Sequence, residues 1–166
     1  MTADRARFVE RLEPWLAGLG FARLDPDASD PVARAALEAL AGLPPYEAVH
    51  SIDLGAEVVL FALLFGERVA GLEVMRRAEM LHRRSKALSA RLDAPVCALQ
   101  LVVYERAVPA EERAFVLGKA RQVPLLFGSA RVASWVVALA EPAVHARRLP
   151  GWPREMSAQA MARLLD

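Results

Sequence analysis

The pattern of apolar and polar residues is most informative between residues 46 and 74. Val58–Phe65 is an uninterrupted apolar run rich in β-branched and aromatic side chains, as is typical of a strand buried on both faces. Gly55 and Gly66 mark turns on either side of this run, and Gly66 suits a tight hairpin turn. Apolar and polar residues alternate before the first turn and again in Arg68–Val74. This pattern predicts a three-stranded antiparallel meander over about 46–74, with Val58–Phe65 as its central strand.

The remaining pattern predicts helices on both sides of this meander. Asp30 followed by Pro31 has the form of a helix N-cap, and Pro109 followed by Glu111 and Glu112 favours the first turn of another helix. The clearest amphipathic stretch is 75–92, which has apolar residues on one side and cations on the other. Predicted helices cover 3–19, 31–41, 75–92, 109–117 and 155–165, and further strands cover 96–104, 122–127 and 132–139.

The resulting element order is ααβββαβαββα, which predicts an α+β fold with a mixed sheet flanked by helices. At 166 residues, the chain has the length of one domain with a substantial core. We expect a helical segment over 1–45, a sheet core over 46–140, and a proline-rich connection with a C-terminal helix over 141–166. Pro124 places the strand that contains it at an edge of the sheet.

Composition and charge give an expectation for the cellular compartment of the protein but favour no class of binding partner. The 21 Lys and Arg residues nearly cancel the 20 Asp and Glu residues, so net charge favours no class of partner. The N-terminal residues lack the apolar core of a signal peptide, and Arg131 interrupts the most membrane-like segment, 123–140. We therefore expect a cytoplasmic protein. Its single cysteine, Cys97, lies in an apolar run and is predicted to be a small buried residue.

The sequence contains no recognisable set of catalytic or cofactor-binding residues. His50, His82 and His145 do not have the spacing of metal ligands, and we expect no metal and no cofactor. Gly18 and Gly20 follow a helix, so they are interpreted as helix stop signals and not as a phosphate-binding loop. These observations favour a non-catalytic domain.

One catalytic hypothesis stays open, because helix, three strands, helix and strand is also the order found in PD-(D/E)xK nucleases. That resemblance implies metal-binding carboxylates on the second and third strands, and the candidates here are Glu57 and Glu73. The family's lysine is replaced by Met75, and the nearest cation is Arg76, which cannot easily act as a base. The alternative for Glu73 is an ion pair with a neighbouring arginine.

The cationic side of the 75–92 helix is the main candidate binding surface. It would contact nucleic acid, an anionic membrane surface or protein, and its alternative is simple exposure to solvent. Met80 lies among the cations, and Trp152, between two prolines, either covers the core or meets a partner. The candidate surface consists of Arg76, Arg77, Met80, Arg83, Arg84, Lys86, Arg91 and Trp152.

Residues 46–145 also resemble the N-terminal domain that precedes the membrane part of some bacterial rhomboid proteases. The features that carry this resemblance are the charged helix MRRAEMLHRRSKALSARL, the strand CALQLVVYERAVP, the acidic helix start at 109–112 and two closing strands. The resemblance implies an accessory domain that docks or regulates, with catalysis located elsewhere. Our leading hypothesis is therefore a regulatory, protein-binding domain. The alternative is a nucleic-acid-binding or degenerate nuclease-like domain that uses the basic helix 76–91, and a homodimer is compatible with either.

Overall fold

The fold is given by a computed structural model, which describes residues 2–118, 121–124 and 129–166, and only the backbone of 121–124. The elements along the chain are α1 (Ala3–Gly18), β1 (Ala22–Arg23), α2 (Pro31–Leu40), β2 (Ala48–Asp53), β3 (Val58–Phe65), the 3₁₀ turn η1 (Gly66–Arg68), α3 (Gly71–Leu92), β4 (Val96–Tyr104), α4 (Ala110–Leu117), β5 (Arg121–Pro124), β6 (Ser129–Ala138), β7 (Ala143–His145), η2 (Arg154–Met156) and α5 (Ala158–Ala162).

The strands form one mixed sheet in the order β1-β2-β3-β4-β6-β5, and β7 also pairs with β6. The sheet begins with the antiparallel strands β1, β2 and β3, and β3, β4 and β6 then run parallel. The predicted α+β class and mixed sheet are confirmed. Strand β5, which contains Pro124, pairs only with β6 among the described strands and ends the order, as predicted for an edge strand.

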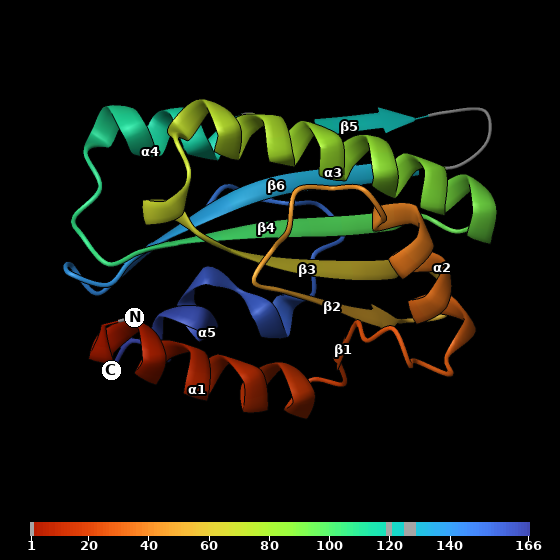
Figure 1. Ribbon diagram of the computed structural model, residues 1–166, viewed down its shortest axis with the longest axis horizontal. Helices are drawn as coiled ribbons and strands as arrows, with labels where there is room; N and C mark the ends of the chain where they lie inside the picture. The colour runs from red at the N-terminus through yellow and green to blue at the C-terminus, as the bar shows by residue number, and fades with distance from the viewer. Residues whose placement is uncertain (1, 119–120, 125–128) are drawn as a thin grey trace.

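Helices cover both faces of the sheet (Figure 1). Helices α2, α3 and α4 lie on one face, where Leu81 and Leu88 of α3 pack against Leu60 and Val132 of the sheet. Helices α1 and α5 lie on the other face, where the apolar stripe of α1 meets the opposite sides of the same strands. The sheet is therefore the middle layer of three, with a separate hydrophobic core on each side.

Two predicted helix starts are confirmed by their caps. The Asp30 side chain accepts a hydrogen bond from the backbone N–H of Ala33, at 2.7 Å, and Pro31 occupies the first turn of α2. The Thr2 side chain caps α1 in the same way. Helix α1 continues through Pro14, because burial of its apolar stripe stabilises the helix around the missing backbone donor.

The prediction that Arg68–Val74 forms the third strand of a meander is wrong. The chain leaves the sheet directly after β3, through η1, and α3 begins at Gly71. The Gly66 backbone lies so close to the ring of Tyr104 that the chain at this point has no space for a Cβ. From Ala70 onward, helical spacing places Val74 on the same buried side as Leu81 and Leu88. Residues 68–74 therefore comprise the end of η1, a short link and the first turn of α3, and β4 takes the place beside β3.

Smaller differences lie at the ends of the sheet and of the chain. Strands β1 and β7 were not predicted and extend the sheet beyond 46–140. The predicted C-terminal helix over 155–165 is reduced to η2 and the short helix α5. Of the predicted strand over 122–127, residues 125–127 lie outside the described residues. Within the described part of the chain, no helix is both long and apolar enough to cross a bilayer.

Cys97 is fully buried in β4, as its apolar neighbours predicted, and this gives a testable chemical consequence. Burial raises the pKa of the Cys97 thiol to about 12, although the nearby Arg131 opposes the shift. The thiol should therefore resist alkylation at pH 8 until the protein unfolds, since the thiolate is the reactive form. In the unfolded chain the thiol loses its proton at a lower pH than in the folded protein. The free energy of unfolding should therefore fall as the pH rises above about 8.5.

Iodoacetamide labelling followed by mass spectrometry along a urea titration measures this protection. The labelling midpoint should coincide with the unfolding midpoint from tryptophan fluorescence. Rapid labelling of the folded protein would contradict the buried position of Cys97.

Candidate functional site

The two carboxylates proposed as metal ligands do not come together. Glu57 precedes β3 and pairs with Arg131, whereas Glu73 follows β3 and pairs with Arg77 at 3.3 Å. The eight residues of β3 separate them, a length of about 26 Å at 3.3 Å per residue. Among the described residues, no three His, Cys, Asp or Glu side chains could hold a metal ion together.

The structure also changes the comparison with the nuclease element order. Three antiparallel strands do precede a helix and a parallel strand, but they are β1, β2 and β3. The third of them, β3, has the sequence VVLFALLF and carries no carboxylate. The position where the nuclease pattern requires an acid and a lysine is therefore entirely apolar.

The cations of α3 fall into two groups. Arg77 is held by Glu73 and donates a 2.6 Å hydrogen bond to the carbonyl of Pro45, while Arg91 pairs with Glu38 at 2.5 Å. The second group takes part in none of the ion pairs found among the described residues, and three of its four members are exposed. We call this second group the α3 basic face, and it consists of Arg76, Arg83, Arg84 and Lys86.

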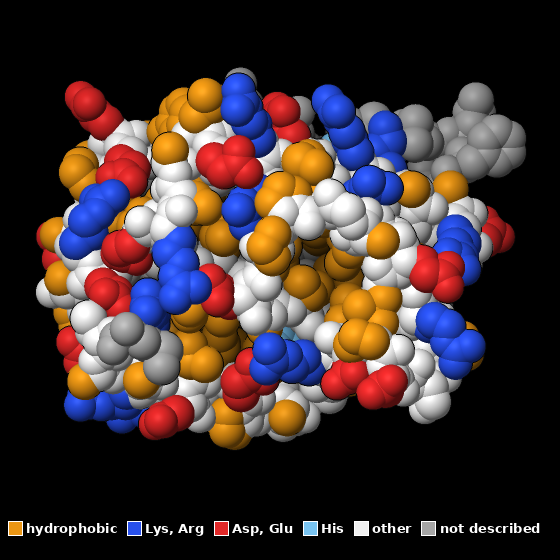
Figure 2. All heavy atoms as spheres, viewed as in Figure 1, with side chains coloured by type: hydrophobic (Ala, Val, Ile, Leu, Met, Phe, Trp, Pro, Cys, Tyr) orange, Lys and Arg blue, Asp and Glu red, His pale blue; other side chains and the backbone are white. Residues whose placement is uncertain are grey.

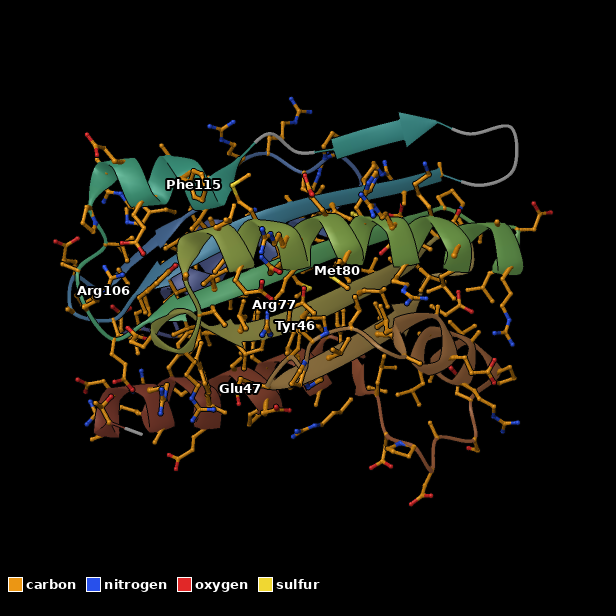
Figure 3. All side chains as sticks on the ribbon, turned by 45° about the horizontal axis from the view of Figure 1, so that its top comes forward. Tyr46, Glu47, Arg77, Met80, Arg106 and Phe115 are labelled. Carbon is orange, nitrogen blue, oxygen red and sulfur yellow. The ribbon has the colours of Figure 1, made fainter. Side chains whose placement is uncertain are left out.

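Exposed apolar side chains lie next to the α3 basic face. Leu72 in the first turn of α3 is 54% exposed, and Phe115 of α4 is 44% exposed. The Phe115 ring lies over Gly71, where a Cβ would be 3.5 Å from the ring, so Phe115 packs against the first turn of α3, the turn that also contains Leu72. Figure 2 shows cationic and apolar side chains interleaved over this part of the molecule, and Figure 3 shows Met80 on the outer side of α3. This surface offers both charge and apolar area.

Trp152 does not belong to this surface. Its ring lies edge-on to Trp135, with the centroids 6.0 Å apart, and its Nε1 donates to the carbonyl of Met156 at 2.9 Å. Both tryptophans pack into the core on the α1 and α5 side of the sheet. The predicted surface is therefore split between two layers, and Trp152 covers the core.

The three histidines occupy different elements. The Nε2 atom of buried His50 in β2 lies 2.9 Å from a carboxylate oxygen of Glu13, and His82 is buried in α3. Burial and the nearby Arg113 lower the pKa of His145 in β7. Among the described side chains, none of them belongs to a group of three or more His, Cys, Asp or Glu residues that could hold a metal ion.

The chain matches no known protein family, no curated protein and no solved structure. Function must therefore be argued from the residues themselves.

A buried polar chain crosses the α3 side of the sheet, and the sequence prediction missed it. The Tyr46 hydroxyl donates to Oε1 of Gln100 at 2.7 Å. Nε2 of Gln100 lies 3.1 Å from both the carbonyl oxygen of Val74 and the hydroxyl of Ser134. Burial raises the pKa of Tyr46, against the effect of Arg77, so the phenol stays a donor. The available signal was the lone polar residue in VCALQLVVY, which must find hydrogen-bond partners when the strand is buried.

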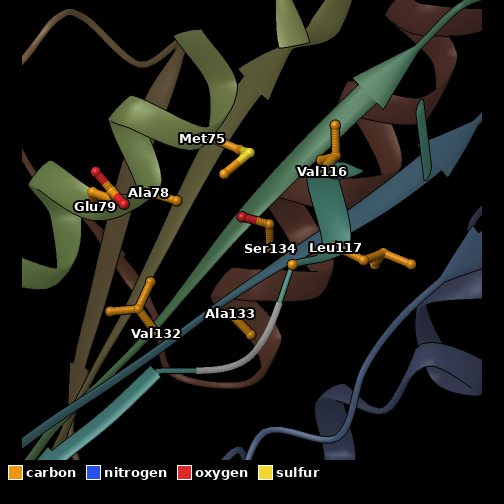
Figure 4. Close-up of a pocket in the computed structure, with 9 residues that line it drawn as sticks. Met75, Ala78, Glu79, Val116, Leu117, Val132, Ala133 and Ser134 are labelled. Carbon is orange, nitrogen blue, oxygen red and sulfur yellow. The ribbon is translucent and has the colours of Figure 1, made fainter. Parts of the chain in front are cut away.

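This polar chain ends at a cavity of about 270 Å³ between α3, α4 and β6. Figure 4 shows residues of all three elements around it. Its lining is mainly apolar and includes Met75, Ala78, Glu79, Val116, Val132 and Ser134. The α3 side of the molecule therefore carries two candidate sites, the basic face with its apolar patch and this partly open cavity.

Proposed function

We propose that this chain is a non-catalytic regulatory domain that binds an acidic, partly apolar segment of a protein partner. The contact surface is the α3 basic face together with Leu72, Met80 and Phe115. The observation that carries the proposal is the position of exposed Leu72 and Phe115 beside cations that take part in no ion pair among the described residues. Interfaces gain affinity from buried apolar anchors, and complementary charge adds specificity.

Two further observations support a binding role over a catalytic one. Glu57 and Glu73 lie at opposite ends of β3, and each is neutralised by an arginine. An accessory domain such as the one that precedes rhomboid proteases would act in the same manner, by docking and without chemistry of its own. The proposed compartment is the cytoplasm.

A second candidate function, nucleic-acid binding, uses the same cations. Phosphates need only the cations of the α3 basic face, and binding would weaken steeply with salt. Leu72 and Phe115 distinguish the two proposals, because apolar anchors matter for a protein segment and contribute little to phosphate contacts.

The test compares two fluorescent probes by anisotropy at low and at physiological salt. One is a peptide of interspersed glutamates and leucines, and the other is a single-stranded oligonucleotide. The variant Arg76→Glu/Arg83→Glu/Arg84→Glu should weaken peptide binding by about tenfold or more, because three favourable charge contacts become repulsive. The matched control Arg147→Glu/Arg148→Glu/Arg154→Glu makes the same charge change at exposed positions before α5 and should bind the peptide as the unmodified protein does.

A second pair of variants separates the two candidate functions. The double variant Leu72→Ser/Phe115→Ser should weaken binding of the peptide and leave binding of the oligonucleotide unchanged. Binding of the oligonucleotide alone, abolished only by the triple variant, would favour the nucleic-acid alternative. Binding of neither probe at low salt would contradict both.

A further inference from the structure

The cavity between α3, α4 and β6 shares no lining residue with the α3 basic face. Its wall includes the Ser134 hydroxyl, and the direction in which this hydroxyl donates is set by the Gln100 amide. The carbonyl oxygen of Val74 can only accept hydrogen bonds, so the Gln100 amide must present its nitrogen there. The same nitrogen donates its other hydrogen to the Ser134 hydroxyl, while Oε1 accepts from Tyr46. The orientation of the amide is therefore fixed by its neighbours.

This fixed amide determines what Ser134 can offer to the cavity. Because the Ser134 oxygen accepts from Gln100, its own hydrogen is left to be donated elsewhere. Within the part of the chain that the structure describes, no acceptor takes that hydrogen. Ser134 is 5% exposed and lines the cavity, and Figure 4 shows its hydroxyl directed toward α3. A buried donor without an acceptor is costly, and a ligand with an acceptor would remove that cost.

The size and lining of the cavity indicate how large the ligand can be and that its body is apolar and uncharged. An apolar cavity of about 150 Å³ accommodates benzene, so 270 Å³ leaves room for a ring of that size with a substituent. Met75, Ala78, Val116 and Val132 supply apolar contacts. An ionised ligand would have to shed its hydration against these side chains, at a large cost.

We propose that this cavity binds a small neutral molecule with an apolar body and one hydrogen-bond acceptor, such as a carbonyl oxygen, which receives the Ser134 hydroxyl. The Tyr46–Gln100–Ser134 chain holds that hydroxyl in its donating orientation. The body of the ligand lies against Met75 and Ala78 of α3 and against Val116 of α4.

Methionine-methyl NMR gives a local readout, because Met75 is the only methionine of the described residues that lines this cavity. Met156 and Met161 lie in the core on the other side of the sheet and serve as internal controls. The probes are acetophenone, its isostere α-methylstyrene, which lacks the oxygen, and benzoate as the anion. Acetophenone should shift the Met75 methyl signal saturably, with a Kd on the order of 1 mM for a ligand of this size. The Met156 and Met161 signals should stay in place, and benzoate should have no effect.

Two variants test the geometry. Ala78→Leu fills the cavity from α3 and should abolish the Met75 response while leaving the fold intact. Ser134→Ala removes the hydrogen-bond donor. It should weaken the binding of acetophenone about fivefold, the effect of one hydrogen bond, without weakening the binding of α-methylstyrene.

Several results would overturn the proposal. They are a Met75 signal that does not respond to acetophenone, a response that persists in Ala78→Leu, and an equal loss of both neutral probes in Ser134→Ala. If Ser134→Ala does not fold, the Ala78→Leu comparison still decides whether the cavity is the binding site. Equal binding of benzoate would refute the neutral class of ligand.

Discussion

Replacing Gly66 with alanine is expected to lower the free energy of unfolding by about 3 kcal/mol, the upper range for overpacking a core. A Cβ at this position would overlap the Tyr104 ring at Cδ1, Cε1 and Cζ. Tyr104 is 1% exposed in the central strand β4, and the Arg106 guanidinium lies 5.0 Å from the centroid of its ring, so the ring has little space into which to move. Urea unfolding followed by tryptophan fluorescence measures the change.

Gly18→Ala is the matched control for this substitution. Gly18 lies in the last turn of α1, and a Cβ there has no heavy atom within 4 Å. Alanine should keep or raise the stability by about 0.5 kcal/mol, since it loses less conformational freedom on folding than glycine does. If both variants had the stability of the unmodified protein, the close contact between Gly66 and Tyr104 would be refuted.

Gln100→Leu should lower the free energy of unfolding by about 2 kcal/mol, although leucine is apolar and of similar size. The substitution adds no cavity of consequence, but it removes the acceptor of the Tyr46 hydroxyl and the donor to the Ser134 hydroxyl. Leaving buried polar groups unpaired costs more than a hydrogen bond contributes. Urea unfolding again gives the magnitude.

A double-mutant cycle isolates the polar contribution. Tyr46→Phe removes the hydroxyl that Gln100→Leu leaves without its acceptor, so the double variant should lose less than the sum of the two single losses. Strict additivity would show that Tyr46 and Gln100 are not coupled. The cycle thus tests the same chain that orients Ser134 toward the cavity.

The elements that the sequence predicted correctly are those whose signal is local. Helix α3 has a full amphipathic repeat, and α2 has an aspartate cap followed by proline, so each is specified within its own segment. The segment 68–74 was misread because an alternation of seven residues fits the first turn of a helix as well as a strand. The deciding contact, between Gly66 of η1 and the Tyr104 ring of β4, joins residues far apart in the sequence and leaves no trace in the local pattern.

The same reason explains which site residues were found and which were missed. The cations of α3 were visible because they share one helix face. The sequence also suggested an ion pair for Glu73, which lies one turn from Arg77. The pairing of Glu57 with Arg131 and the position of Trp152 depend on how distant segments meet across the sheet. A lone glutamine in an apolar strand did signal a buried polar group, but its partners Tyr46 and Ser134 come from other elements.

Neighbouring side chains of β6 face opposite sides of the sheet, and this determines how the effects of substitutions in the chain combine. Val132 and Ser134 face α3, whereas Ala133 and Trp135 face α1 and α5. Residues on opposite faces share no packing partner, so the effects of substitutions on the two faces should be nearly additive. The layer beneath α1 and α5 can therefore be redesigned for stability with little effect on the cavity, provided that Ala133, which also lines the cavity, is kept.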